Sequence, residues 1–220
     1  MLDDPLSFID YIRDDPDDFL RFLSQHIQLI LVSVLVAVAL AVPAAILVSR
    51  IRPLARPMTW LASVGQTIPS LAVLGFLMPF LGIGFRPALV ALTIQAFLPI
   101  FLNAFVGLRS IDRAVLDAAR GMGTSGTQRL LLVEMPLASP VIFAGIQTAT
   151  VQNIAIATLA AYIGAGGLGD LILQGLSTLN GALLIAGAVP VALLAILAEV
   201  GLGRVRRAIV PVGLRTERGA

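Results

Sequence analysis

The chain has 220 residues, of which 58% are hydrophobic and only 13% are charged, and its mean hydropathy is +0.95. Soluble domains are about half apolar and about a quarter charged, so this composition excludes an ordinary soluble protein and indicates an integral membrane protein. The formal net charge is +2, there is no cysteine and His26 is the single histidine, which argues against disulfides and against a metal site.

Residues 1–26 alternate aspartates with large apolar side chains. A secretory signal would begin with positive charge, so this acidic segment does not have the pattern of one. The alternation predicts an external amphipathic segment at the membrane surface, with a second helix starting near Pro16. A solvated helix face is the simpler interpretation, and an acidic surface for a partner or a cation is the alternative.

Uncharged runs locate the membrane-spanning helices, because about 20 apolar residues cross the hydrocarbon and a central charge costs about 2.5 to 3.5 kcal/mol. The runs cover residues 27–49, 58–85, 87–108, 135–169 and 171–198. Each of the first three is long enough to span once. The second and third are separated only by Arg86, which predicts a tight hairpin there.

The last two runs need division. The fourth is too long for one simple span and ends in a glycine-rich string at 164–169, so we expect one span over 137–163 followed by a break. The fifth divides at Asn180 and Gly181 into a short helical or re-entrant piece and a final span near 182–202. The sequence therefore predicts an all-α polytopic protein with about five transmembrane helices in a domain of residues 27–202.

The arginines set the topology of these spans. Three groups follow the first, third and fifth spans and share one side of the membrane, including a basic tail at 203–220. Only Arg13, Arg21 and Arg86 fall on the other side. The positive-inside rule then predicts a multi-pass plasma membrane protein with its N-terminus outside and its C-terminus in the cytoplasm, so that the basic pI reflects topology and not nucleic acid binding. Near the end of the last span, we expect Glu199 to pair with Arg204 or Arg206.

The charged segment 109–136 lies on this cytoplasmic side and has helical signals. We expect Ser110 to cap a first helix that ends at Arg120, with Gly121 in a left-handed conformation after it. Ser125 and Gln128 form a capping-box pattern for a second helix running to about Met135. Pro136 then marks the restart into the next span.

The glycines in this segment have the spacing of a phosphate-binding loop, at Gly121, Gly123 and Gly126. A dinucleotide fingerprint must follow a strand and open a helix, whereas these glycines follow a helix. A Walker loop also needs a lysine, and the chain contains none. We therefore expect no nucleotide or other cofactor to be bound by this chain.

Asp117-Ala118-Ala119, Gly123, Val133, Met135 and Pro136 instead match another pattern, with every spacing in agreement. They closely resemble the EAA loop of the membrane subunits of binding-protein-dependent ABC importers. In that family the loop is a short coupling helix seated in a groove of a cytoplasmic ATPase. The resemblance implies a type I importer permease (MetI-like) core and ATPase-coupling residues at Asp117, Ala118, Ala119, Gly121, Gly123 and Pro136.

The resemblance covers nearly the whole chain. The strings at 65–92, 119–123 and 148–172 are similar to permeases of osmoprotectant importers that carry glycine betaine, choline, carnitine and related quaternary amines. This similarity implies cytoplasmic ATPase subunits that hold ATP and Mg, a separate extracytoplasmic substrate-binding protein, and a second permease copy or homologue in the bilayer. A permease of a sibling importer for amino acids or methionine is the alternative.

Polar side chains inside the spans are candidates for a translocation path, since they are expensive in lipid and usually face the bundle interior or water. The candidates are Gln66, Gln95, Asn103, Gln147, Thr150, Gln152, Asn153 and Thr158. Helical spacing does not allow all of those in the fourth span to line one pore, so hydrogen bonding between helices is an equal alternative for any one of them. Phe76, Phe97, Phe101 and Tyr162 are the aromatic residues available singly to a quaternary amine.

Two further classes of function are disfavoured by the sequence. A secondary carrier or channel without an ATPase is disfavoured by the lack of an acidic residue deep in a span and by the EAA-like loop. A membrane enzyme is disfavoured because no cluster of histidine, cysteine or acidic residues lies at membrane depth, so we expect no catalytic residues.

Overall fold

The computed structural model describes residues 7–209, apart from the side chains of Ser7, Asp10, Arg52 and Ile209. Every regular element in these residues is helical. In chain order the elements are α1 (Ser7–Asp14), α2 (Pro16–Arg50), α3 (Arg52–Gly65), α4 (Ser70–Leu81), α5 (Phe85–Arg109), α6 (Arg113–Gly121), α7 (Gly126–Arg129), η1 (Leu130–Glu134), α8 (Met135–Ala157), η2 (Thr158–Ile163), α9 (Leu168–Thr178) and α10 (Gly181–Ile209).

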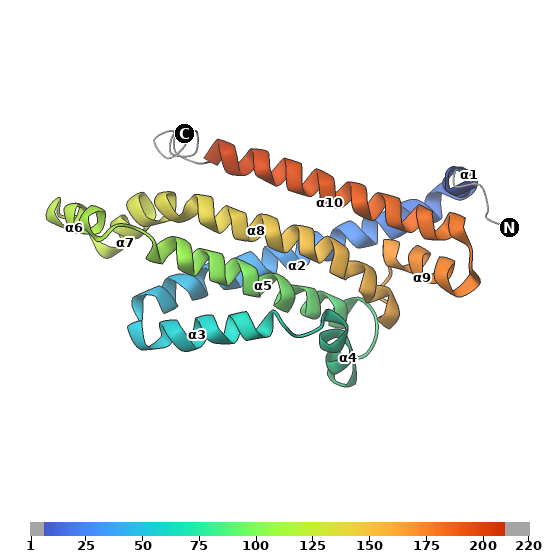
Figure 1. Ribbon diagram of the computed structural model, residues 1–220, viewed down its shortest axis with the longest axis horizontal. Coiled ribbons are helices and arrows are strands. Elements are labelled where there is room, and N and C mark those ends of the chain that lie inside the picture. Colours follow the sequence, from blue (N-terminus) through green and yellow to red (C-terminus); the bar gives the residue numbers. More distant parts are fainter. Residues whose placement is uncertain (1–6, 210–220) are drawn as a thin grey trace.

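The long helices lie side by side along the molecule (Figure 1). At one end are α6 and α7, together with the C-terminal ends of α2, α5 and α10, and we call this the α6 end. At the other, which we call the α9 end, are α1 and α9. The arginine groups after the first, third and fifth spans therefore gather at the α6 end, as the topology prediction requires, although Arg215 and Arg218 lie outside the described residues.

Four helical stretches are long and apolar enough to cross a membrane: Pro16–Arg50, Phe85–Arg109, Gly126–Ile163 and Gly181–Ala208. A fifth crossing arises only if α3 and α4 are counted together, because these two helices are bent by 96° at the break between them. The second span expected over residues 58–85 is therefore not one continuous helix, and it counts as a crossing only as this bent pair.

The sequence at the break explains the bend. The N–H groups of Thr67 and Ile68 donate to the carbonyls of Val64 and Gly65, which tightens the end of α3 into turns of three residues. Pro69 then adopts an extended conformation and brings no N–H to continue the ladder. The following turn also differs from the expected hairpin at Arg86, since the chain reverses at residues 82–84 and Arg86 lies in the first turn of α5.

The core is centred on α5, which packs most extensively on α2 and α8. On α2, Ala37, Ala41 and Ala45 form a fully buried stripe with one residue per turn. Alanines on the facing helices are equally buried, namely Ala88, Ala96 and Ala104 on α5 and Ala138, Ala149 and Ala157 on α8. Small residues let membrane helices approach closely, and close packing is the main attraction between helices in lipid.

Two glycines allow α5 and α8 to approach each other closely. A Cβ added at Gly145 would lie 2.5 Å from Cβ of Asn103 and 3.1 Å from the Pro99 carbonyl oxygen. One added at Gly107 would lie 3.2 Å from the Ala138 carbonyl oxygen. The contact at Gly145 leaves no room for a side chain, and the contact at Gly107 leaves room only if its neighbours shift by a few tenths of an ångström. These two positions therefore keep the helices close together.

Replacing Gly145 with alanine is therefore expected to destabilise the protein by about 1–3 kcal/mol, because the inserted methyl group forces α5 and α8 apart. The matched control is Gly75→Ala in α4, where an added Cβ has no atom within 4 Å. Thermal unfolding in detergent measures both variants. Equal melting temperatures for the two would contradict this account of the α5–α8 contact.

One buried polar residue joins three long helices. The side-chain amide of Asn153 on α8 donates to Oγ of Ser33 on α2 at 3.1 Å and to the carbonyl of Leu92 on α5 at 3.0 Å. Asn153 and Ser33 are fully buried. This arrangement fixes the register of the three helices, because a sliding movement of any one would leave these groups unpaired.

At the α9 end, the glycine-rich string 164–169 packs on α2. The Gly167 N–H donates to Oε1 of Gln25 at 3.1 Å, and the neighbouring His26 places Nε2 3.2 Å from the Ile154 carbonyl. That carbonyl is available because the helix changes from α to 3₁₀ geometry after Ala157, so the Thr158 N–H bonds to Ala155 instead. The predicted break after Ile163 is confirmed, with Gly164 left-handed at φ +68°.

The predicted division at Asn180 is also confirmed, since its Oδ1 accepts from the N–H of Ala182 and starts α10. Two predicted domain boundaries fall inside helices. Residue 26 lies within α2, which runs unbroken from Pro16, and α10 continues past residue 202 to Ile209. Residues 1–6 of the acidic segment and 210–220 of the basic tail lie outside the described residues.

Candidate functional site

α6 stands at one end of the molecule as a short helix with a cap at its start. Asp112 Oδ1 accepts from the N–H of Ala114 at 2.9 Å, so Asp112 is the N-cap. The expected cap at Ser110 is wrong, because the Ser110 hydroxyl donates back to the Gly107 carbonyl and closes the end of α5. An acidic cap at this place is also favoured by the helix dipole.

The chain leaves α6 through a tight turn at Gly123. Its φ is +79°, and the Thr124 hydroxyl and N–H both bond to the Ala119 carbonyl. The left-handed residue is thus Gly123 and not Gly121, which is the last residue of α6 itself. The predicted capping box is confirmed, since Gln128 N–H donates to Ser125 Oγ and Ser125 N–H donates to Gln128 Oε1.

The predicted restart at Pro136 is wrong, because helical structure is continuous from Gly126 to Ile163. A π-helical turn, η1, lies just before the proline, and the Met135 N–H donates to the Leu130 carbonyl five residues back. Pro136 has no N–H to give to an α-helical partner, so a change of hydrogen-bond register at this point costs little.

The residues expected to couple to an ATPase differ in exposure. Asp117, Ala118, Gly121 and Gly123 are exposed, whereas Ala119 is buried and Pro136 is partly covered. Asp117 forms an exposed ion pair with Arg120 at 2.9 Å, which contributes little to stability. Only Ala118 of the alanine pair is therefore available for close approach by a partner, while Ala119 holds the turn against the rest of the protein.

Glu134 was missed by the sequence reasoning and is the most buried acidic group near this site. It is 3% exposed and pairs with two arginines. Both guanidinium nitrogens of Arg50 bond to its two oxygens, at 2.5 and 3.1 Å, and Arg129 Nε lies 3.1 Å from Oε1. A signal was present, because Glu134 is the single acidic residue between Asp117 and Asp170 and lies at the entry to an apolar span.

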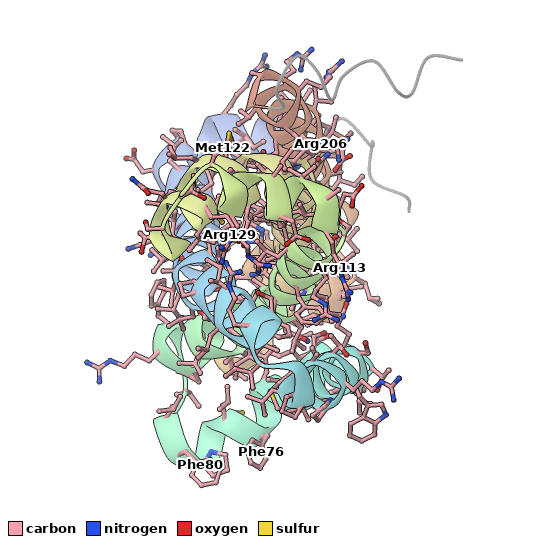
Figure 2. All side chains as sticks on the ribbon, turned by 90° about the vertical axis from the view of Figure 1, so that its left-hand side faces the viewer. Phe76, Phe80, Arg113, Met122, Arg129 and Arg206 are labelled. Carbon is pink, nitrogen blue, oxygen red and sulfur yellow. The ribbon has the colours of Figure 1, made fainter. Side chains whose placement is uncertain are left out.

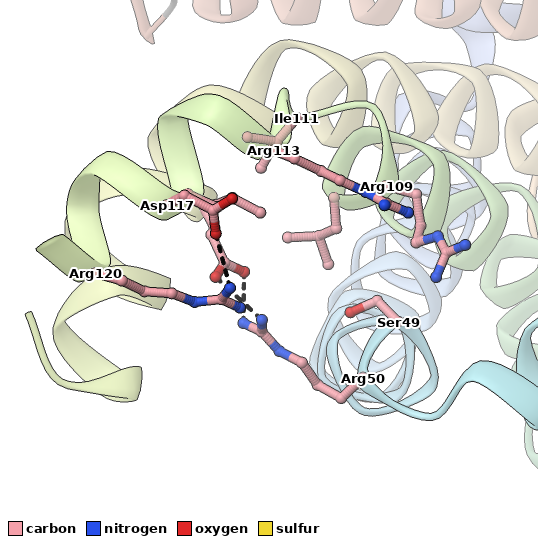
Figure 3. A pocket seen from close by; sticks show the side chains of 10 residues that line it. Ser49, Arg50, Arg109, Ile111, Arg113, Asp117 and Arg120 are labelled. Atoms are coloured by element: carbon pink, nitrogen blue, oxygen red, sulfur yellow. Dashed lines mark hydrogen bonds and ion pairs between the residues drawn. The ribbon is translucent and has the colours of Figure 1, made fainter.

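A polar cavity of about 420 Å³ lies between α6 and the ends of α2 and α5 (Figure 3). Its lining includes Arg50, Arg109, Arg113, Arg120 and Asp117. Seen end-on, Arg129 lies near the centre of this face of the molecule and Arg113 lies toward its right-hand edge (Figure 2). The site therefore combines an exposed helix, a cationic hollow behind it, and the buried Glu134 at the wall of the hollow.

The eight path candidates divide into three groups and do not form one site. Gln147 and Asn153 are buried and bond to other helices, the former through Glu199 O at 3.1 Å. Asn103, Thr150 and Thr158 bond to carbonyls of their own helices. Gln66 and Gln152 are exposed and Gln95 is partly exposed. In residues 7–209, no candidate bonds to another, so the idea of hydrogen bonding between helices applies to Gln147 and Asn153.

Two smaller expectations are settled. The side chain of Glu199 forms no ion pair with any described residue, so the pairing expected with Arg204 or Arg206 is wrong. The Glu199 backbone carbonyl accepts a hydrogen bond from Gln147.

Aromatic contacts between described residues stay within single helices, namely Phe76–Phe80 on α4 and Phe97–Phe101–Phe105 on α5. Rings from different helices therefore do not converge on a cation site in this part of the chain.

A bundle of long apolar helices with a short capped helix projecting at one end defines a polytopic membrane protein. The family model for the binding-protein-dependent transport system inner membrane component matches residues 30–211, and the chain belongs to this family. It is the membrane component of a transport system and not an enzyme.

Close relatives agree over nearly the full chain. The carnitine transport permease protein OpuCB of Listeria monocytogenes is 41% identical, with 96% of this chain and 97% of the relative covered. The choline transport system permease protein OpuBB of Bacillus subtilis (strain 168) is 38% identical, with 94% and 95% covered. The resemblance to permeases of osmoprotectant importers, which was predicted from the EAA-like loop and the strings at 65–92, 119–123 and 148–172, is confirmed.

The fold also matches a solved structure. Inward facing conformations of the MetNI methionine ABC transporter give a TM-score of 0.81 at 22% identity, covering 88% of this chain and 97% of that chain. At this level of identity the likeness concerns the fold alone. It confirms the all-α architecture with a MetI-like permease core.

Proposed function

We propose that this chain is the membrane-spanning subunit of an ATP-driven importer for quaternary-amine osmoprotectants, and that α6 is its docking helix for a cytoplasmic ATPase. ATP and Mg are held by that ATPase. The observation that carries the proposal is α6 itself, an exposed helix with a defined cap and exit turn at the end of the molecule where the arginine groups gather. The positive-inside rule makes that end cytoplasmic and the α9 end external.

The geometry suits a docking element that moves as a unit. The Asp112 cap and the Gly123 turn fix both ends of α6, and Ala118 offers a small exposed surface for close approach. Beside it, Asp117 supplies a carboxylate for a polar contact. Because both of its ends are fixed, α6 transmits a displacement imposed by a partner to the connected spans instead of bending.

The translocation path lies, in this proposal, on the surface where a second permease copy or homologue packs. Thr148, Gln152 and Ala155 are exposed along one face of α8, and Gln66 is exposed at the break between α3 and α4. Exposed polar groups on a membrane-spanning helix are favourable where they meet water or a partner. Because the aromatic rings of different helices do not converge, solute specificity resides in an external substrate-binding protein that delivers to this path.

Ala118→Glu tests the docking role. An unpaired carboxylate in the centre of a protein interface costs at least about 1.4 kcal/mol, so the affinity for the ATPase is expected to fall at least about tenfold and uptake to fall with it. Ala118→Ser is the matched control, because it keeps a small side chain at the same place. Co-purification with the ATPase and solute uptake in vesicles are the measurements. Unchanged assembly and uptake in Ala118→Glu would refute docking through α6.

The solute is tested separately by uptake of labelled carnitine, choline and glycine betaine through the complete system. The relatives named for carnitine and choline support this class. Competition between these solutes is expected, with no competition from methionine. Uptake of methionine or another amino acid instead would assign the chain to a sibling importer and leave the permease role intact.

A further inference from the structure

The ion triad of Glu134 with Arg50 and Arg129 joins the docking segment to the first long helix. We infer that Glu134 is a positioning residue that passes the movement of α6 and α7 to α2. This inference rests on the proposed function, since it concerns what happens after an ATPase moves α6. It is carried by the placement of three charges, two of them on the continuous helix Gly126–Ile163 and one at the end of α2.

The triad has the geometry of a firm link. Arg50 is the last residue of α2, and two of its guanidinium nitrogens donate to the Glu134 carboxylate at 2.5 and 3.1 Å. The two residues are 84 positions apart in the sequence. Arg129 is the last residue of α7 and lies 16% exposed. A two-pronged guanidinium contact fixes direction as well as distance, so a displacement of α7 is conveyed to the end of α2.

The π-helical turn η1 makes this link possible. In a regular α-helix, positions five apart are rotated by about 140° around the axis, so residues 129 and 134 would face different ways. A turn with hydrogen bonds five residues apart places one nearly above the other, and Arg129 Nε then reaches Glu134 Oε1 at 3.1 Å. Such turns are rare and often mark functional positions.

Other connections between the two parts are sparse. α2 packs extensively on α5 and α8, and α6, α7 and η1 are not among its extensive partners. The cavity of about 420 Å³ separates α6 from the ends of α2 and α5, with Arg50 and Glu134 in its wall. The triad therefore links the end of α2 to the segment 126–134 at the edge of the cavity. At this place α2 and that segment have few packed side chains in contact.

Glu134→Gln tests this role, since glutamine keeps the size but removes the charge and leaves two guanidinium groups facing a neutral amide. The amount of solute taken up per ATP hydrolysed is expected to fall about fivefold or more, because the coupling between two sites is commonly worth this much. Assembly with the ATPase is expected to persist, because α6 and its caps are unchanged. Glu199→Gln is the matched control, an exposed glutamate at the same end whose side chain has no partner among the described residues.

A double-mutant cycle with Arg50→Gln makes the test specific. If Glu134 acts through Arg50, the double variant is expected to lose no more coupling than the worse single variant, whereas independent effects would multiply. Arg50→Lys keeps the charge without the fork and is expected to give an intermediate ratio, and it serves if Glu134→Gln does not fold. A parental ratio in Glu134→Gln, or in both Arg50 variants, would overturn the inference. Failure of Ala118→Glu to disturb docking would instead overturn the proposed function.

Discussion

Replacement of Gly169 by alanine is expected to destabilise the protein by more than about 3 kcal/mol, the largest effect of any single methyl group in the described chain. A Cβ at this position would lie 2.2 Å from the Thr158 carbonyl oxygen and 2.8 Å from both the carbonyl carbon and Cα of the same residue. All three are backbone atoms, so no side-chain rotation relieves the overlap. α9 would have to separate from η2 at the point where the chain turns back into the bundle.

Thermal unfolding followed by circular dichroism in detergent measures the effect, and at this chain length the melting temperature is expected to fall by at least about 6 °C. Gly201→Ala in α10 is the control, because an added Cβ there has no atom within 4 Å. That change is expected to be neutral or stabilising, since alanine favours helix more than glycine. If Gly169→Ala unfolds like Gly201→Ala, the close contact between α9 and η2 does not exist.

Asn153→Asp is expected to be nearly as damaging, at about 3 kcal/mol, although the two side chains have the same shape. The amide nitrogen that now donates to Ser33 and Leu92 would become an oxygen. One oxygen would then face the Leu92 carbonyl oxygen with no proton between them, and a fully buried carboxylate would have no cation beside it.

Gln152→Glu is the appropriate comparison, because it makes the same chemical change one residue earlier, at an exposed position on α8. Its effect on the melting temperature is expected to be small. The yield of folded protein after detergent extraction provides a second measure. Equal losses from the two substitutions would mean that Asn153 does not hold α2, α5 and α8 together.

Several local signals in the sequence were reliable where the controlling group lies within a few residues. Ser125 and Gln128 predicted a capping box, Asn180 predicted the start of the last helix, and the glycine string predicted the break after Ile163. Each of these depends on a side chain that bonds to its own neighbourhood. The expected cap at Ser110 was wrong, because the Ser110 hydroxyl closes the preceding helix and Asp112 caps α6 instead.

Features set by distant residues were not predictable in this way. Hydropathy over residues 58–85 cannot reveal a 96° bend, because both halves are apolar and only the turn at Pro69 separates them. Asn153 and Gln152 look alike in sequence, yet one is buried between three helices and the other faces outward. Glu134 was overlooked because its partner Arg50 is 84 positions away and the π-helical turn that directs it leaves no simple pattern.

The unbroken length of α2 has a mechanical consequence. Its 35 residues extend about 50 Å, well beyond the roughly 30 Å of membrane hydrocarbon. Near one end Gln25 and His26 hold the Gly167 loop and the end of α8, and at the other end Arg50 holds Glu134. A single continuous helix, with Pro43 inside it, thus makes contacts near both ends of the molecule, so in the proposed importer a tilt of α2 produced at the α6 end would also move the α9 end.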